Sequence, residues 1–224
     1  ERLVAGGEAL ARRDDGRIVL VDGALPGEEV VVTVTTRRGA DRGDLVRVVV
    51  PSPDRVTPPC PLVARGCGGC DLMHLDGPAQ PAAKVAVVAD ALRRLGRWAE
   101  PAVRSGPPLA AWAFRTTMRF GVTDGRAGLR RSASHDLVTV DSCAIAHPRL
   151  DELVREGRFG AAAEVTLRVG AGTGERLALL APGRDDGVRL PDDVLVIGAD
   201  ELAAGKRAWF HEEVAGRRWR VSAG

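Results

Sequence analysis

The sequence predicts a mainly β protein of the α+β class, and three observations support this. Short runs of alternating apolar residues fill residues 1–56, residues 80–96 have helical periodicity, and strand-like runs return after residue 97. With 224 residues, the chain is long enough to bury a core in one large domain or two small ones. We expect one domain over residues 1–56 and a second over residues 57–224.

The first domain is expected to be a small barrel. Three short runs are rich in apolar residues and are expected to be strands, at 17–21, 29–34 and 45–50. Turn-forming residues separate the runs, at 14–16, 25–27 and 37–39. Four or five short strands joined by tight turns predict a closed β-barrel of the oligonucleotide-binding kind. Arg12, Arg13 and Arg38 lie beside its loops and are candidate contacts for RNA phosphates, although such arginines are more often a solvated surface.

A cysteine-rich turn follows. Cys60, Cys67 and Cys70 lie in a glycine-rich, proline-flanked segment, and the fourth cysteine, Cys143, lies far along the chain. Glycines between the cysteines let the backbone fold back, so that several sulfurs can point at one metal. Four thiolates suit either a structural zinc or an iron–sulfur cluster, and the spacing leaves both open. His74 is expected to be structural or an outer-shell partner of the site.

The composition argues against a polycationic protein and against a membrane protein. The 32 basic and 30 acidic residues leave a net charge of only +2, so the chain is not a polycation. It has no apolar run of membrane-spanning length, and we expect no signal peptide. We therefore expect a cytoplasmic monomer without a membrane partner, whose cysteines are reduced rather than paired in disulfides.

The rest of the chain predicts α+β structure with a mostly antiparallel sheet. Apolar residues spaced along 80–96 predict one amphipathic helix ending at Gly96, and a second, short helix is expected at 148–159. An arginine-bearing turn is expected at 125–134. Strands are expected at 114–120, 136–140, 164–169, 175–180, 193–197, 209–214 and 217–221.

The glycine run Val169-Gly-Ala-Gly-Thr-Gly174 is similar to a nucleotide- or S-adenosylmethionine-binding loop. Such a loop joins a strand to a helix, and an acidic residue normally precedes it. Here Arg168 precedes the glycines, and another strand-like run follows them. We therefore expect a hairpin turn rather than a cofactor site.

Taken together, these features resemble the TrmA/RumA-type RNA (uracil-5-)-methyltransferases along nearly the whole chain. The segments similar to the family's opening barrel, the TRAM domain, are 6–12, 15–21 and 24–28. Pro51-Ser-Pro-Asp-Arg55 with Cys60-Pro and Cys67-Gly-Gly-Cys70 matches its cluster-binding signature. The segments similar to its central domain are 114–115, 118–120, Gly128, 134–138 and 141–143.

The resemblance implies site residues. Cys60, Cys67, Cys70 and Cys143 would bind a [4Fe–4S] cluster. Contacts to the RNA substrate would come from Arg115, Arg119, Arg130, Arg131 and His135, together with the barrel arginines. The chain departs from the family pattern in its first cysteine gap, which has six residues rather than five, and at Met73 and Thr117.

Members of the family continue into a domain that binds S-adenosylmethionine and carries the thiolate that adds to uracil C6. The chain ends at Gly224 without these elements, so we expect no catalytic residue and no S-adenosylmethionine site within it. The resemblance thus implies the RNA-binding and iron–sulfur front half of a 23S rRNA (uracil-5-)-methyltransferase, inactive by itself. The alternatives are a stand-alone RNA-binding module with a structural four-cysteine metal site and, less favoured, an electron-transfer protein.

Overall fold

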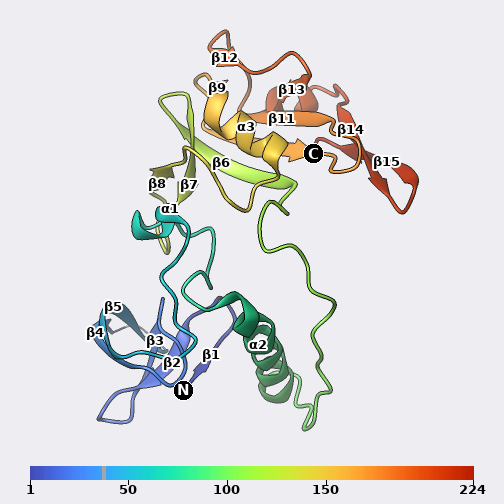
Figure 1. Cartoon of the computed structure of the whole chain (residues 1–224). Coiled ribbons are helices and arrows are strands. Elements are labelled where there is room, and N and C mark those ends of the chain that lie inside the picture. Colours follow the sequence, from blue (N-terminus) through green and yellow to red (C-terminus); the bar gives the residue numbers. More distant parts are fainter. Residues whose placement is uncertain (37–38) are drawn as a thin grey trace. The chain divides into compact units, whose positions relative to one another are not determined.

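The computed structural model describes residues 1–36 and 39–224, and the contacts within it divide the chain into two units. Unit 1 comprises Glu1–Val63 and Cys70–Pro108, and unit 2 comprises Ala64–Gly69 and Leu109–Gly224. Each unit has its own sheet and helices (Figure 1). The domain division expected after residue 56 stays a prediction. No helix in the described ranges combines the length and apolar character needed to cross a membrane.

Unit 1 contains a five-stranded mixed sheet in the order β1-β2-β3-β5-β4. Its strands are β1 (Arg2–Leu3), β2 (Ala9–Arg12), β3 (Ile18–Val21), β4 (Glu29–Thr35) and β5 (Asp41–Val50). The pairing of β3 with β5 is parallel and the other three ladders are antiparallel. The strands expected at 17–21, 29–34 and 45–50 are therefore confirmed.

The expectation of a closed barrel is wrong for the part of unit 1 that the structure describes. Closure requires the two edge strands to pair, but β1 pairs with β2 and β4 pairs with β5 in an open order. The core around Val19 and Val21 is instead covered by Leu75 and by the helix that follows it.

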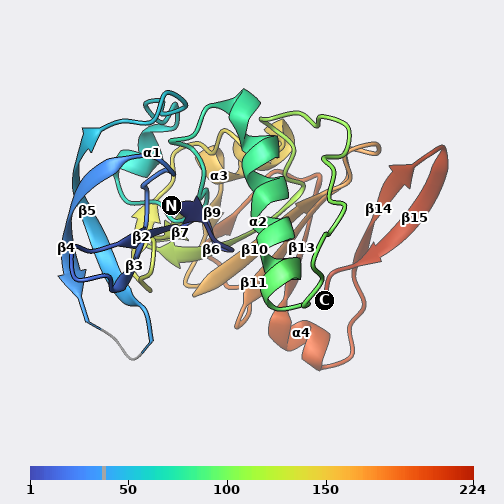
Figure 2. The same cartoon turned by 90° about the horizontal axis from the view of Figure 1, so that it is seen from below.

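That helix, α2 (Gln80–Arg94), follows the short 3-10 turn η1 (Gly77–Ala79), and Figure 2 shows it from a second direction. The side-chain amide of Gln80 donates to the carbonyls of Leu72 and Leu75 at 3.1 Å, which fixes the start of the helix. The helix expected at 80–96 is confirmed. The residues that pack on the sheet core are Ala83 and Val87, whereas the apolar side chains of Val88 and Leu95 are exposed.

Unit 2 contains a six-stranded sheet in the order β13-β11-β10-β6-β7-β8. Its strands are β6 (Thr117–Thr123), β7 (Arg126–Arg130), β8 (Leu137–Thr139), β10 (Glu164–Val169), β11 (Arg176–Ala181) and β13 (Val194–Gly198). The pairing of β11 with β13 is parallel and the other four ladders are antiparallel. The sheet is thus mostly antiparallel, as expected.

Two expectations for turns have different outcomes. The turn expected over 125–134 is wrong for residues 126–130, which form strand β7, whereas turns are found at Gly125 and after Arg131. The reversal between β6 and β7 needs only Asp124 and Gly125, both at positive φ, which is typical of a tight hairpin. By contrast, the glycine run at 169–174 does join two antiparallel strands, with Val169 paired to Arg176. That hairpin is confirmed.

Helix α3 (Pro148–Glu156) packs on one face of the sheet through Leu150, Leu153 and Val154, which are fully buried. On the opposite face, Leu177 and Ile197 form a second core with Phe210. Phe210 belongs to the hairpin of β14 (Trp209–Val214) and β15 (Arg217–Ser222). The smaller elements are α1 (Pro61–Ala64), β9 (Arg158–Phe159), β12 (Val188–Arg189) and α4 (Ala199–Ala203).

Candidate functional site

The four cysteines are shared equally between the units. Cys60 and Cys70 belong to unit 1, and Cys67 and Cys143 belong to unit 2. All four are thiols; Cys143 is buried and the others are partly exposed. Neither unit by itself supplies more than two of them. Among the described residues, no group of three or more His, Cys, Asp or Glu side chains is arranged to hold a metal ion. The four-cysteine ligand set therefore stays a prediction.

Within unit 2, the glycines of the cysteine turn allow it to lie against the end of β7. Cys67 forms an antiparallel bridge with Arg131. The backbone N–H of Gly68 donates to the Arg130 carbonyl at 3.0 Å, and that of Ser132 donates to the Gly66 carbonyl at 3.1 Å. A Cβ on Gly68 would lie 2.8 Å from the backbone nitrogen of Ser132. The turn therefore needs glycine at this position because two backbones meet there.

Cys143 is held by the first turn of α3. Its backbone N–H donates to Oδ1 of Asp151 at 2.7 Å, and the Ser142 hydroxyl donates to Oδ2 of the same carboxylate at 2.9 Å. Asp151 was not selected from the sequence. The sequence could have indicated it, because Asp151 is an acidic residue in the first turn of a helix that begins at Pro148. A carboxylate in that position accepts hydrogen bonds from nearby backbone N–H groups.

In unit 1, the chain after Cys70 is fixed by close backbone packing. A Cβ on Gly7 would lie only 2.6 Å from the Cβ of Asp71, so the β1–β2 turn passes directly against this segment. His74 is buried, and burial together with the charge of Arg55 lowers its pKa. The backbone carbonyl of His74 accepts from Val56 at 3.0 Å. The lowered pKa favours the neutral imidazole, and its buried Nε2 has no hydrogen-bond partner among the described residues.

Several of the predicted RNA-binding residues share one face of the unit 2 sheet. Because side chains alternate along a strand, Met118 and Phe120 are buried whereas Arg119 between them is exposed. The pairing of Arg119 with Thr166 and of Thr117 with Arg168 puts both arginines on the same side. We call this surface the arginine face; it consists of Arg119, Arg130, Glu164, Thr166 and Arg168.

Contacts on the arginine face leave one cation uncompensated. The Arg130 guanidinium donates to Oε1 of Glu164 at 3.1 Å and lies 3.1 Å from Nδ1 of His135. Arg119 forms no ion pair within the described part of the chain. The structure thus brings together Arg119, Arg130 and His135 and adds Arg168. Arg168 alternates with the buried residues of β10. This alternation in the sequence could have predicted that Arg168 lies on the arginine face.

The remaining predicted contacts lie elsewhere. Arg115 is exposed, and its backbone is fixed by hydrogen bonds with Ile145 and His147. Arg131 donates to the Arg65 carbonyl at 2.9 Å and thereby supports the cysteine turn. In unit 1, Arg12 pairs with Glu1 at 2.7 Å, and Arg13 lies 3.6 Å from Asp41. Arg38 lies outside the described residues.

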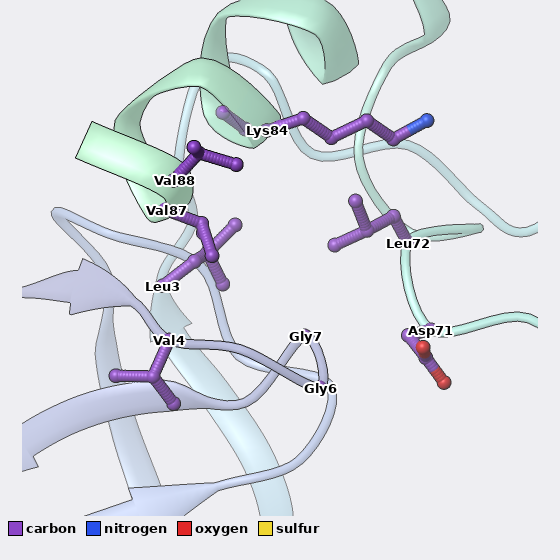
Figure 3. A pocket seen from close by; sticks show the side chains of 10 residues that line it. Leu3, Val4, Gly6, Gly7, Asp71, Leu72, Lys84, Val87 and Val88 are labelled. Carbon is purple, nitrogen blue, oxygen red and sulfur yellow. The ribbon is translucent and has the colours of Figure 1, made fainter. Parts of the chain in front are cut away.

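Unit 1 also has a pocket of about 240 Å³ between the β1–β2 turn and α2 (Figure 3). Most of its lining is apolar, and the charged groups are the ammonium of Lys84 and the carboxylate of Asp71. The lining residues are Leu3, Val4, Gly6, Gly7, Asp71, Leu72, Ala83, Lys84, Val87 and Val88. The sequence did not predict this pocket, because its walls come from segments far apart in the chain.

Comparison with known proteins identifies homologues that are named RNA methyltransferases. A protein of Streptomyces avermitilis, named an uncharacterized RNA methyltransferase, is 36% identical over 98% of this chain and 56% of its own length. A second, from Streptomyces coelicolor, is 36% identical over 98% of this chain and 53% of its own length. The 23S rRNA (uracil(1939)-C(5))-methyltransferase RlmD of Methylococcus capsulatus is 41% identical over 63% of this chain and 33% of its own length.

A solved structure has a similar fold. The tRNA (uracil-54, C5)-methyltransferase of Pyrococcus abyssi, crystallised with S-adenosyl-L-homocysteine, aligns with a TM-score of 0.58 and 20% identity. The alignment covers 97% of this chain and 60% of that one. No protein-family model matches the chain. The chain spans about half the length of the Streptomyces relatives.

Proposed function

We propose that this chain, a homologue of proteins named RNA methyltransferases, is the RNA-binding and cluster-binding part of a 23S rRNA (uracil-5-)-methyltransferase. The observation that carries the proposal is 36% identity over 98% of the chain to RNA methyltransferases of Streptomyces. The similarity to RlmD of Methylococcus capsulatus, together with the resemblance of the cysteine signature described above, favours 23S rRNA as substrate and uracil C5 as the methylated position.

The arginine face is the proposed RNA contact in unit 2. Arg119 is exposed and unpaired among the described residues, so a phosphate can bind it without breaking an existing ion pair. Arg130 is held by Glu164 and His135, which keeps its guanidinium at the edge of the same surface. Arginine suits this role because its planar fork donates to two phosphate oxygens at once. Arg115 and Arg131, and in the first domain Arg12, Arg13 and Arg38, are proposed as further contacts.

Cys60, Cys67, Cys70 and Cys143 are the proposed ligands of one [4Fe–4S] cluster. Four reduced thiols are a donor set that such clusters accept. The cluster would serve as a structural cross-link between the cysteine turn and the segment that leads into α3. Asp151 supports this arrangement by fixing the backbone at Cys143. Residues 1–56 are the proposed TRAM domain and residues 57–224 the iron–sulfur and central domain.

The relatives are longer than their match to this chain. We propose that the methyl transfer takes place in that additional part of the enzyme. There S-adenosylmethionine would supply the methyl group, and a thiolate would activate uracil by adding to C6. We assign no catalytic and no S-adenosylmethionine-binding residue to this chain. Within it, the proposed task is to bind the RNA in an unstacked form, so that the target base is accessible. We also propose that the protein is cytoplasmic and monomeric.

The proposal is tested by measuring RNA binding and metal content on anaerobically purified protein. We expect binding to a 23S rRNA fragment that weakens steeply with salt, because phosphate contacts release counterions. Arg119→Ala should weaken binding and lower the slope of log affinity against log salt by about 0.7, the value for one phosphate contact on a single strand.

Arg93→Ala is the matched control, because Arg93 is an exposed arginine on α2 without an ion pair to any described residue. RNA affinity that does not respond to salt contradicts the RNA-binding assignment. Stoichiometric zinc without iron contradicts the cluster and favours a stand-alone RNA-binding module with a zinc site.

A further inference from the structure

The β14–β15 hairpin has a basic, aromatic face that the proposed function does not use. In both views the hairpin extends away from the sheet of unit 2 (Figure 1 and Figure 2). The register pairs Trp209 with Ser222, His211 with Arg220, and Glu213 with Arg218. Because paired residues point to the same side, these six residues form one face, which we call the Trp209 face.

At the base of the hairpin, this face carries a flat, positively charged stack. The Arg220 guanidinium carbon lies 4.7 Å above the centre of the Trp209 ring. Trp209 is 42% exposed, and Arg220 forms no ion pair with any described residue. Indole rings and guanidinium planes are the groups on which unpaired bases stack, and an adjacent cation attracts the phosphate that links those bases.

The same face is held in place by Glu175. Its carboxylate accepts from the Arg218 guanidinium at 2.5 Å, from the backbone N–H of His211 at 2.8 Å, and lies 3.0 Å from Nδ1 of His211. These contacts, the backbone N–H of His211 first among them, lower the pKa of Glu175. Glu175 thus neutralises Arg218 and leaves Arg220 as the available cation beside Trp209.

The Trp209 face adjoins the arginine face. Nη1 of Arg168 donates to the backbone carbonyl of Ser222 at 2.6 Å, and Ser222 is the residue paired with Trp209. Arg168 is a diagonal neighbour of Arg119 on the paired strands β10 and β6, because Arg119 pairs with Thr166 and Arg168 with Thr117. A nucleic-acid strand that followed Arg119 and Arg168 would therefore reach Trp209 next. The other face of the hairpin is different in character, because Phe210 and Val221 at its base pack into the core.

We propose that Trp209 and Arg220 stack an unpaired base of a single-stranded RNA whose phosphates lie along the arginine face. This inference rests on the proposed function, since it extends the path of the same RNA within unit 2. It predicts that the hairpin contributes affinity for single strands through stacking, which depends little on salt. Phosphate contacts at Arg119 supply the salt-dependent part.

The test measures binding of a labelled ten-nucleotide oligouridine to the full chain by fluorescence anisotropy. Trp209→Ala should weaken binding about tenfold, the order expected for loss of one stacked base, without changing the salt slope. Trp209→Phe should retain most of the affinity, because the smaller ring still stacks. Arg220→Gln should also weaken binding. Since Arg220 is exposed, this variant keeps the test valid if Trp209→Ala fails to fold.

Trp219→Ala is the matched control, because Trp219 is 53% exposed on the opposite face of the same hairpin. Its affinity should stay within about twofold of the wild type. Wild-type affinity in both Trp209→Ala and Arg220→Gln overturns the inference while leaving the proposed function standing. An equal loss in Trp219→Ala also overturns it, since the hairpin would then act only through its stability. If the wild-type chain binds neither the oligouridine nor the 23S rRNA fragment, the proposed function itself fails.

Discussion

The two glycines of the Cys67-Gly68-Gly69-Cys70 turn should differ in how well they tolerate replacement by alanine. A Cβ at Gly68 would lie 2.8 Å from the Ser132 backbone nitrogen and 2.9 Å from its Cα. Neither atom can move without shifting the chain that follows β7. A Cβ at Gly69 would lie 3.5 Å from Sγ of Cys67, which is ordinary contact. Gly68→Ala is therefore the disruptive change and Gly69→Ala its control.

The expected loss follows from the hydrogen bonds at that contact. Moving the turn away from β7 breaks the bonds from Gly68 to Arg130 and from Ser132 to Gly66. At about 1 kcal/mol each, their loss should lower the free energy of unfolding by about 2 kcal/mol. For a chain of this size, that corresponds to a fall in melting temperature of about 4–8 °C.

Thermal unfolding followed by circular dichroism, with iron measured on the same samples, provides the assay. Gly68→Ala should melt earlier and hold less iron, because Cys67 moves with the turn. Gly69→Ala should match the wild type in melting temperature within about 2 °C, since its new methyl group meets no backbone atom. Equal melting temperatures for the two variants would refute the reasoning that backbone contact at Gly68 fixes the turn.

Three further predictions concern the rest of unit 2. Cys143→Ala should give a colourless, poorly folded protein under anaerobic purification, and a stable brown variant would contradict its assignment as a cluster ligand. Leu153→Ala should lower the free energy of unfolding by about 2–5 kcal/mol, because Leu153 is fully buried between α3 and the sheet; denaturant unfolding measures this, and a loss below 1 kcal/mol would contradict it. Hydrogen bonds from Arg176 lower the pKa of Asp193, so its stabilising contribution is complete above the unfolded value of 3.8 and is lost as the pH falls through the lower folded value. Asp193→Asn should therefore flatten the acid side of the stability profile measured by denaturant unfolding, and an unchanged profile would contradict the ion pair.

The local elements could largely be predicted from the sequence. Alternation in the run at 164–169 predicted β10, and helical spacing predicted α2. These predictions succeed because the periods of strands and helices are local properties of the chain. The turn expected at 125–134 failed over residues 126–130, because arginine and glycine residues there suggested a loop, whereas pairing with β6 and β8 makes them a strand.

The barrel failed for a related reason. The sequence contains the strands, but closure depends on whether distant edge strands pair. In unit 1, Leu75 and α2 cover the core, so the apolar side of the sheet is buried without an additional ladder. No local pattern distinguishes these two ways of covering the same apolar face.

For the candidate site, the sequence by itself determined the chemistry: four thiols, glycines between three of them, and arginines in the second half of the chain. The tertiary structure decided which of these groups meet. The register of β6 and β10 puts Arg119 beside Arg168, and the approach of Ser132 explains why position 68 requires glycine. Residue types and spacing are fixed along the chain, whereas register and backbone approach depend on pairings between distant segments, which only the folded structure specifies.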